Sequence, residues 1–498
     1  MSNSQVILSI DQGTTSSRTL VFTIDGTLLH TAQASFPQIY PQDGWVEHDP
    51  EAIWKTVTDT LSDAFEFCQN NNLEIKAAGI TNQRETTLIW NRKTGAPIYN
   101  AIVWQDRRTA DHCARLKDAG HEPVIKTKTG LLLDPYFSAS KAAWILDNVE
   151  GARTKANNGE LLFGTIDSFL IWRLTAGRTH ATDATNASRT SLLNIKTSQW
   201  DPELLEIFNV PPSLLPSVKD CADDYGTISE DIIPGNIAIF GVAGDQQAAL
   251  IGQGCFNAGE LKSTYGTGCF IVTNTGQDMI LSKNNLLTTI GYRLNGKTTY
   301  ALEGSIFVAG AAIQWLRDGL KLFDSNGEIT PLVEKETDNP DLYFVPALTG
   351  LGAPHWNPNA RGAMFGLTRG ASRADIIRAA LEGVAFQTHD LLDAMDKDGI
   401  TPTALRVDGG MSANNWFLQA LANITDITVE RPPMLETTAL GAAQLAIMYL
   451  QAINSDETDN LKMHKKLERF SPEWESPYRL KRLEKWEKAV KATQTFSQ

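Results

Sequence analysis

Residues 11–19 read DQGTTSSRT, which is an acidic residue followed by a glycine, a run of hydroxyl residues and an arginine. The stretch lies between VILSI (6–10) and LVFTI (20–24), two apolar runs that alternate like β-strands. Backbone N–H groups of a tight turn and short hydroxyl side chains are good donors to phosphate oxygens. The stretch therefore predicts a strand–turn–strand hairpin that holds the phosphates of a nucleotide.

Several residues of this hairpin have a specific expected part. Gly13 would let the backbone approach a phosphate, and Arg18 would add a charged fork. Hydroxyl donors are expected from Thr14, Thr15, Ser16 and Ser17. Asp11 would repel a phosphate unless a divalent cation lay between them, and Mg²⁺ is usually held by carboxylate, phosphate and water oxygens. An ordinary solvated turn is the alternative interpretation.

Composition and charge limit the class of protein. The chain has 498 residues, of which 42% are hydrophobic and 20% charged, and this length suggests two domains. A formal net charge of -14 makes nucleic acid and acidic membrane surfaces poor partners, because both repel an anion. Five scattered cysteines without a CxxC pair fit a reduced compartment. With no secretory signal, and a longest uncharged stretch (437–455) that predicts a buried helix rather than a membrane span, the cytoplasm is the expected location.

Periodicity and turn signals predict an alternation of strands and helices. Asp49-Pro50 predicts the start of a helix, because aspartate caps the first turn and proline suits it. Asp25-Gly26 predicts a turn into a third strand. The last forty residues, rich in lysine and glutamate, predict a surface helix. Further strands are expected at 77–83, 87–91, 237–242 and 405–407, and further helices at 140–148, 372–390 and 437–450.

A second hairpin repeats the layout of the first. KSTYGTGCFIVT (262–273) again places hydroxyl residues and glycines between two apolar strands, which makes Thr267 a second candidate phosphate contact. Asp408-Gly409-Gly410 follows a strand, and two glycines there would let a flat ring lie on the backbone, with Asn414 near a base. A plain strand-to-helix turn is the alternative. The repeated layout suggests a duplicated α/β architecture with domains 1–252 and 253–498 around a cleft.

The order of these motifs resembles that of the actin- and hexokinase-like ATPases. More narrowly, the chain resembles the FGGY carbohydrate kinases over about residues 5–490. The resemblance implies two actin-like (ribonuclease H-like) α/β domains around a central cleft. The strings that carry it are ITNQRETTLIWNRKTGAPIYNAIVWQDRRT (80–109), YFSASKAAWILDN (136–148), GDQQAALIGQ (244–253), GAMFGLTRGASRADIIRAALEG (362–383) and ETTALGAAQLA (436–446).

The resemblance further implies that ATP, with Mg²⁺, phosphorylates glycerol. Arginine only donates hydrogen bonds and glutamate only accepts them, so the adjacent pair Arg84-Glu85 could bind two hydroxyls at once. The alternative interpretation of this pair is a surface salt bridge. Asp245 is implied as the base that takes the proton of the alcohol; a helix cap is its alternative reading. The implied acceptor contacts are Arg84, Glu85, Trp104, Tyr136, Asp245, Gln246 and Phe270.

The remaining roles are implied in the same way. Asp11 and Asp245 are the expected metal contacts, and the family implies a homodimer or homotetramer. Two alternatives stay open: a sister kinase of a pentulose or another polyol, and an actin-like nucleotide switch without transfer, which would not need Arg84, Glu85 or Tyr136. The implied nucleotide contacts are Thr14, Thr15, Ser16, Arg18, Thr267, Gly310, Gln314, Gly410 and Asn414.

Three controls known in some bacterial members of this family are not expected in this chain. Residues 224–233 (DYGTISEDII) contain no basic residue to bind fructose 1,6-bisphosphate. No histidine that a phosphocarrier could phosphorylate occurs between positions 181 and 354. SPEWESPYRL (471–480) does not resemble a docking site for a transport regulator. Strong inhibition by millimolar fructose 1,6-bisphosphate would contradict the first expectation.

Overall fold

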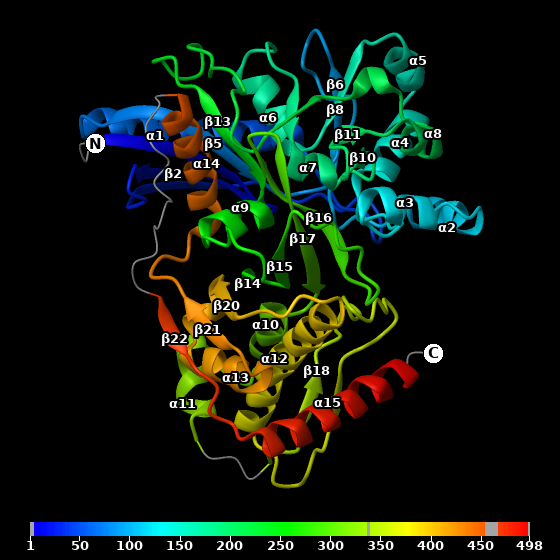
Figure 1. Ribbon diagram of the computed structural model, residues 1–498, viewed down its shortest axis with the longest axis vertical. Helices are drawn as coiled ribbons and strands as arrows, with labels where there is room; N and C mark the ends of the chain where they lie inside the picture. Colours follow the sequence, from blue (N-terminus) through cyan, green and yellow to red (C-terminus); the bar gives the residue numbers. More distant parts are fainter. Residues whose placement is uncertain (1–3, 336–338, 454–466, 497–498) are drawn as a thin grey trace.

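The computed structural model describes residues 4–335, 339–453 and 467–496, and it has two lobes, each built around a β-sheet (Figure 1). The strands of the first half are β1 (Gln5–Gln12), β2 (Ser16–Thr23), β3 (Leu28–Ser35), β4 (Glu47–His48), β5 (Glu74–Asn82), β6 (Leu88–Asn91), β7 (Ala101–Ile102), β8 (Leu161–Gly164), β9 (Ala181–Asp183), β10 (Leu193–Asn194), β11 (Gln199–Trp200), β12 (Ser217–Lys219) and β13 (Ile239–Gly244). Its helices are α1 (Pro50–Asn70), α2 (Ala110–Asp118), α3 (Glu122–Thr129), α4 (Ser138–Asn148), α5 (Ala152–Asn157), α6 (Ile166–Leu174), α7 (Ala184–Ser188), α8 (Pro202–Phe208), η1 (Pro212–Leu214) and α9 (Asp245–Gly252).

The second half follows the same alternation of strands and helices. Its strands are β14 (Leu261–Tyr265), β15 (Cys269–Gly276), β16 (Leu287–Leu294), β17 (Lys297–Ile306), β18 (Tyr343–Val345), β19 (Ala363–Phe365), β20 (Ala404–Asp408), β21 (Thr428–Arg431) and β22 (Glu468–Phe470). Its helices are α10 (Gly310–Asp318), η2 (Asn326–Glu328), α11 (Ile329–Val333), α12 (Arg373–Lys397), η3 (Gly410–Ala413), α13 (Asn415–Thr425), α14 (Thr437–Ile453) and α15 (Ser476–Phe496).

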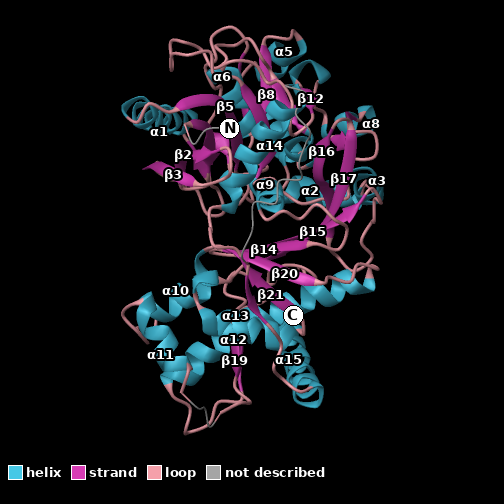
Figure 2. Cartoon of the chain, turned by 60° about the vertical axis from the view of Figure 1, so that its left-hand side comes forward, coloured by secondary structure: helices cyan, strands magenta, loops and turns pink. Residues whose placement is uncertain are grey.

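The two sheets share one topology, as the repeated hairpin predicts. The first has the order β13-β5-β1-β2-β3, and the second contains β21-β20-β14-β15-β17 with β16 and β22 added at its edges. Among the five shared strands of each sheet, the first three in sequence (β1, β2 and β3; β14, β15 and β17) pair antiparallel, and the next two add in parallel. Both lobes contain strands and helices, and β14, β15 and β20 lie where the two lobes meet (Figure 2). The predicted duplicated α/β fold is confirmed.

Local sequence signals account for the predicted elements near the first sheet. Asp49 caps α1 by accepting from the backbone N–H of Glu51 at 2.9 Å, and Pro50 occupies the first turn. The β2–β3 turn contains Gly26 at a φ of +85°, where a side chain would be strained. The first hairpin differs from the prediction in one respect: Ser16 and Ser17 belong to β2, and Ser17 is buried against Thr56, with 2.9 Å between their hydroxyl oxygens. Ser17 is therefore not an available phosphate donor.

Helix α14 comes from the second half of the sequence but lies on the first sheet, in contact with β1, β5 and β13 (Figure 1). Glycines let its backbone approach: a Cβ on Gly441 would lie 1.8 Å from the carbonyl oxygen of Ala248 in α9. A Cβ on Gly252 would lie 1.9 Å from the carbonyl oxygen of Thr437. The two helices thus touch backbone to backbone, and the predicted buried helix at 437–450 is confirmed.

We expect Gly441→Ala to destabilise the protein by about 3 kcal/mol, because the added methyl group meets rigid backbone rather than a movable side chain. Helix propensity alone would favour alanine by about 1 kcal/mol, so a loss of stability isolates the packing effect. Denaturant midpoints measure the change. Gly370→Ala is the matched control, since its nearest neighbour is the Thr368 hydroxyl at 3.8 Å. Equal stability of both variants would contradict the backbone contact.

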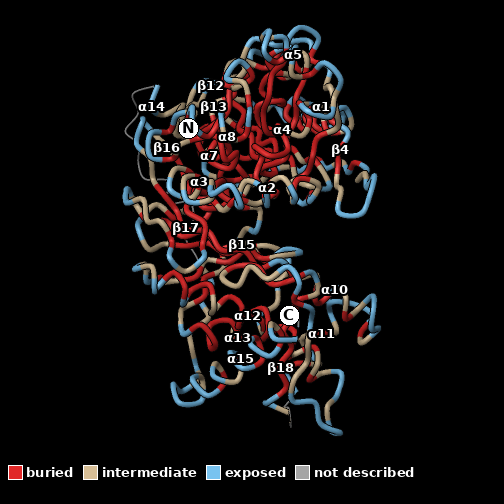
Figure 3. Tube along the Cα trace, turned by 90° about the vertical axis from the view of Figure 1, so that its right-hand side faces the viewer, coloured by how far each residue is buried: buried red, intermediate tan, exposed pale blue. Residues whose placement is uncertain are grey.

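The C-terminal helix differs from its prediction as a surface helix. One side of α15 belongs to the core of the second lobe, which is the lower one in Figure 1. There Trp486 stacks on Phe386 with ring centroids 5.2 Å apart. Arg482 is buried there as well and donates to Glu382 at 2.7 Å. Buried chain is concentrated at the centre of each lobe (Figure 3). Within the described ranges, no helix is long and apolar enough to span a bilayer.

Candidate active site

The adjacent pair Arg84 and Glu85 follows the end of β5 and is buried, with residue exposures of 3% and 1%. Residue type alone favours a surface salt bridge for such a pair, and that interpretation is wrong. Arg84 instead forms a bidentate ion pair with Glu303 of β17, with its Nη1 2.5 Å from Oε2 and its Nη2 3.1 Å from Oε1. Glu85 has a φ of +62°, which is uncommon for a residue with a side chain and is held here by surrounding contacts.

Arg189 closes this cluster into a network of four buried charges. Its Nε donates to Glu85 Oε1 at 2.6 Å and its Nη2 donates to Glu303 Oε1 at 3.0 Å. Burial would raise the pKa of Glu303, but Arg189 and Arg84 outweigh that effect and hold the pKa at about 2. Two arginines balance two glutamates, so the network is neutral and its side chains are held in one arrangement.

Asp245 is the first residue of α9, directly after β13, and it lies beside Arg84. Its Oδ1 is 3.2 Å from Arg84 Nε and accepts from the backbone N–H of Gln246 at 2.7 Å. A third of the side chain remains exposed, at 33%. Burial raises the pKa of Asp245 against the lowering effects of Arg84 and Lys262, which makes the carboxylate a better proton acceptor than an exposed aspartate.

Lys262 fixes the orientation of the neighbouring glutamine. It is fully buried in β14, and its Nζ donates to Gln246 Oε1 and, at 2.9 Å, to the hydroxyl of Thr264. Because Oε1 is occupied by the ammonium group, the amide nitrogen of Gln246 is the part left for another partner. Gln246 thus presents a donor next to the Asp245 carboxylate.

The three predicted aromatic contacts also come together. The ring of Trp104 meets Tyr136 at 5.8 Å and Phe270 at 6.3 Å between centroids, both nearly edge to face. All three side chains are only partly buried, so the group keeps an accessible apolar surface. Trp104 Nε1 donates to the hydroxyl of Thr14 at 3.1 Å, which joins this wall to the first predicted phosphate hairpin. The group therefore borders both predicted subsites.

The first hairpin has the tight turn expected for phosphate binding. The N–H of Gly13 donates to the carbonyl oxygen of Ser16 at 2.9 Å, and Thr15 is exposed. Arg18 is engaged by carboxylates: it donates to Asp11 Oδ2 at 2.5 Å and to Glu436 Oε2 at 2.7 Å. Its contact with phosphate therefore stays a prediction.

The predicted nucleotide contacts of the second half cluster around the other hairpin. Gly310 begins α10 and donates to the carbonyl oxygen of Gly266, next to Thr267, at 2.9 Å. Gly409 has a φ of +86° and lies so close to Tyr265 that a Cβ would be 2.5 Å from its carbonyl oxygen. The Gly409–Gly410 turn therefore lies directly against this hairpin.

Two further predicted nucleotide residues lie on neighbouring helices. Asn414 caps α13 by accepting from the N–H of Phe417 at 3.0 Å, and Gln314 is exposed on α10. Asp408, before the Gly409–Gly410 turn, accepts from Gln253 at 2.8 Å and from Thr437 at 2.5 Å. The turn is thereby tied to the end of α9 and the start of α14.

A metal ion would have to be held by few protein ligands. In the part of the chain that the structure describes, no three or more His, Cys, Asp or Glu side chains are grouped to hold one. Mg²⁺ needs only one or two carboxylates besides phosphate and water oxygens. Asp11 and Asp245 fit that requirement by donor type, and burial raises the pKa of Asp11 against the opposing effect of Arg18.

Sequence reasoning missed Glu303, Arg189 and Lys262, which hold the predicted residues in place. A signal existed for Glu303, which is the one charged residue in YALEGSI (300–306), a mostly buried stretch of β17. A charge within a buried strand needs a partner. The partners, however, lie 219 and 114 positions away in the sequence, and no local pattern identifies them.

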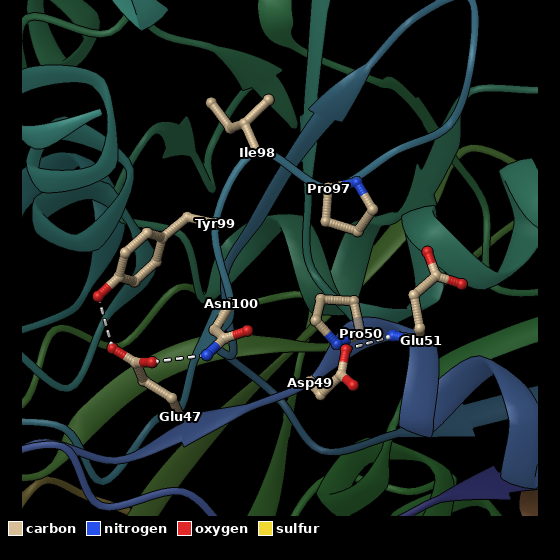
Figure 4. Close-up of a pocket in the computed structure, with 8 residues that line it drawn as sticks. All are labelled: Glu47, Asp49, Pro50, Glu51, Pro97, Ile98, Tyr99 and Asn100. Atoms are coloured by element: carbon tan, nitrogen blue, oxygen red, sulfur yellow. Dashed lines mark hydrogen bonds between the residues drawn. The ribbon is translucent and has the colours of Figure 1, made fainter. Parts of the chain in front are cut away.

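A surface pocket elsewhere in the first lobe is unrelated to these residues (Figure 4). Its lining residues are Glu47, Asp49, Pro50, Glu51, Pro97, Ile98, Tyr99 and Asn100. Glu47 already accepts from Tyr99 and from Asn100, each at 2.8 Å. The predicted site residues do not line this pocket, so it lies outside the candidate active site.

Comparison with known proteins gives consistent matches over nearly the whole chain. The profiles of the FGGY family of carbohydrate kinases match residues 6–252 with the N-terminal domain and 261–450 with the C-terminal domain. The chain is 55% identical over 489 residues to a glycerol kinase of Rhodospirillum centenum, and 58% identical over 492 residues to one of Chelativorans sp., covering 98% of each chain in both cases. A solved structure of Plasmodium falciparum glycerol kinase with ADP is 38% identical, covers 98% of both chains and has a TM-score of 0.93. A xylulose kinase from Lactobacillus acidophilus has the same fold, at 23% identity and a TM-score of 0.87.

Proposed function

The chain belongs to the FGGY family of carbohydrate kinases, and from this premise we propose that it transfers the γ-phosphoryl group of ATP to glycerol, giving sn-glycerol 3-phosphate. The observation that carries the proposal is Asp245 beside Arg84, at 3.2 Å, in a buried network that also contains Glu85. Asp245 can accept a proton, and beside it Arg84 is a fixed hydrogen-bond donor and Glu85 a fixed acceptor. Three hydroxyls on a short carbon chain match that combination.

Each group of the site has a proposed part in the transfer. Asp245 accepts the proton of the glycerol hydroxyl as it attacks the γ-phosphorus, and Gln246 donates to the substrate beside it. Arg84 and Glu85 bind the other two hydroxyls. Tyr136 provides a third polar contact to the substrate, and Trp104 and Phe270 pack against its carbon chain. Positioned proton transfer is worth roughly 10²–10⁴-fold in rate, and alignment and charge neutralisation supply the rest.

The phosphate side of the reaction is assigned to the two hairpins. We propose that Thr14, Thr15, Ser16 and Arg18 bind the transferred phosphate and that Thr267, Gly310, Gln314, Gly410 and Asn414 bind the remainder of the nucleotide. Asp11 and Asp245 would hold Mg²⁺, which neutralises charge on the phosphate oxygens. The close backbone packing of the second hairpin with the Gly409–Gly410 turn supports one continuous nucleotide surface.

The proposal is tested by coupled ADP release from purified protein with ATP and Mg²⁺, using glycerol, dihydroxyacetone, xylulose or no acceptor. We expect strong turnover with glycerol and little without an acceptor. Turnover only with xylulose would replace the proposed substrate with a pentulose, as in the xylulose kinases that share this fold. Hydrolysis of ATP independent of an acceptor would favour an actin-like nucleotide switch.

We also propose a cytoplasmic location and a homodimer or homotetramer. An anionic chain whose described helices include no candidate membrane span supports the first part of this proposal. Cell fractionation tests the location, and light scattering on the purified protein tests the assembly. A monomer at micromolar concentration would overturn the second part.

A further inference from the structure

Lys141 of α4 is a lysine with 0% exposure, which is rare for this residue type. Its Nζ donates to three consecutive carbonyl oxygens, those of Pro135 at 2.7 Å, Tyr136 at 2.6 Å and Phe137 at 3.2 Å. An ammonium group has three N–H donors, so all of them are used. The whole hydrogen-bonding capacity of this buried charge is therefore directed at one short segment.

Helix stability does not explain this arrangement. Helix α4 begins at Ser138, and the ammonium group reaches back to the residues that precede it. Positive charge is unfavourable near the N-terminus of a helix, because the helix dipole is positive there. Burial of a charge costs free energy as well, and the hydrogen bonds of Lys141 go to carbonyls rather than to a carboxylate. The helix dipole and the burial of the charge both lower the stability of the folded protein. The arrangement therefore points to a role for Lys141 in placing residues 135–137.

The segment carries contacts to both parts of the proposed glycerol site. The Tyr136 ring lies against Trp104 and has the Arg189 guanidinium 5.7 Å from its centre. Immediately after it, the Ser138 hydroxyl donates to the carbonyl oxygen of Glu85 at 3.0 Å. A shift of the segment would therefore move Tyr136 and the backbone of Glu85 together.

We propose that Lys141 is a positioning residue for the acceptor alcohol: its ammonium group clamps the carbonyls of residues 135–137 and so holds Tyr136 and Glu85 at the spacing that glycerol needs. This inference rests on the proposed function. The lysine does not touch the substrate and acts through the segment that it holds.

A dependence on pH follows from the same geometry. Burial lowers the pKa of Lys141 to about 8, against the raising effects of Glu85, Asp106, Asp134 and Cys113. Loss of the proton removes one of the three donors and leaves a lone pair facing carbonyl oxygens. The clamp is therefore complete below pH 8 and weakens as the pH rises through that value, with glycerol affinity falling alongside it.

The test is the Michaelis constants of Lys141→Met. We expect the glycerol KM to rise at least tenfold while the ATP KM stays within twofold, because the nucleotide contacts lie on other elements. Lys128→Met is the matched control: it removes a lysine of the same lobe that pairs with Asp201 at 2.7 Å, and its glycerol KM should be unchanged. An unchanged glycerol KM in Lys141→Met, with turnover intact, would overturn this inference alone.

A second measurement does not depend on the folding of that variant. In the unaltered protein the glycerol KM should rise severalfold between pH 7 and 9.5, while the ATP KM stays within twofold over the same range. A glycerol KM that stays flat over this range would overturn the inference. Absence of any glycerol-dependent turnover in the unaltered protein would instead overturn the proposed function, and this assignment with it.

Discussion

Asp245→Asn should lower kcat for glycerol phosphorylation by about 10²–10⁴-fold, because asparagine keeps the shape of the side chain but cannot accept the proton of the alcohol. The carboxylate is placed for this task by Arg84, 3.2 Å away, and by its position at the start of α9. Its raised pKa adds to its strength as a base. Steady-state ADP release with saturating ATP and glycerol measures the change.

Asp201→Asn is the matched control for Asp245→Asn. Asp201 is likewise an aspartate at a helix start, capping α8, and it also pairs with a basic side chain, that of Lys128. Because it lies outside the candidate site, its loss should leave kcat within twofold. A kcat of Asp245→Asn within tenfold of the unaltered protein would contradict the role of Asp245 as the base.

Glu303→Gln should destabilise the protein by about 3–5 kcal/mol and raise the glycerol KM at least tenfold. The substitution removes the carboxylate that bonds both Arg84 and Arg189, and breaking one partner out of a buried ion pair leaves charge uncompensated. Arg84 then loses the bidentate contact with Glu303 that orients its Nε toward Asp245. Denaturant unfolding and glycerol kinetics measure the two effects separately.

Glu382→Gln separates the loss of a buried ion pair from damage to the site. It breaks the buried pair with Arg482 in the other lobe, so we expect a comparable loss of stability with an unchanged glycerol KM. If both variants changed the glycerol KM equally, Glu303 would have no specific part in acceptor binding.

The effect of Glu303 on stability should depend on pH in a defined direction. Its pKa is about 2 in the folded protein, below the ordinary value of 4.5. A depressed carboxyl pKa contributes stability that is complete above the unfolded value and is lost as the pH falls. The difference in unfolding free energy between the unaltered protein and Glu303→Gln should therefore shrink between pH 4.5 and 2. A constant difference over that range would contradict the ion pairs.

Much of the fold could be predicted because its signals are local. The Asp49 cap and the Asp25-Gly26 turn depend on a few neighbouring residues, and the duplicated hairpins could be recognised from their layout. Among the predicted site residues, the structure brings Arg84 and Asp245 into contact although they are 161 positions apart. Their roles in catalysis stay predictions.

What could not be predicted depends on distant partners. The buried state of Arg84 follows from Glu303 on a strand of the second sheet, and nothing in the residues around Arg84 indicates that partner. The packing of α14 on the first sheet is likewise decided by shape, since Gly441 fits against Ala248 without any local pattern that names α9. The burial of Ser17 depends on Thr56, which comes from another element.

The crossing of α14 means that the chain cannot be cut into two self-sufficient pieces where its halves meet in sequence. A fragment ending at residue 252 would carry the first sheet without the helix that covers β1, β5 and β13, and the buried residues Ile7, Leu20 and Ala77 would face water. The rest of the chain would carry an apolar helix with nothing beneath it. We therefore expect two fragments split at this position to complement each other rather than to fold independently. A rearranged chain would have to keep residues 437–453 within reach of the first sheet.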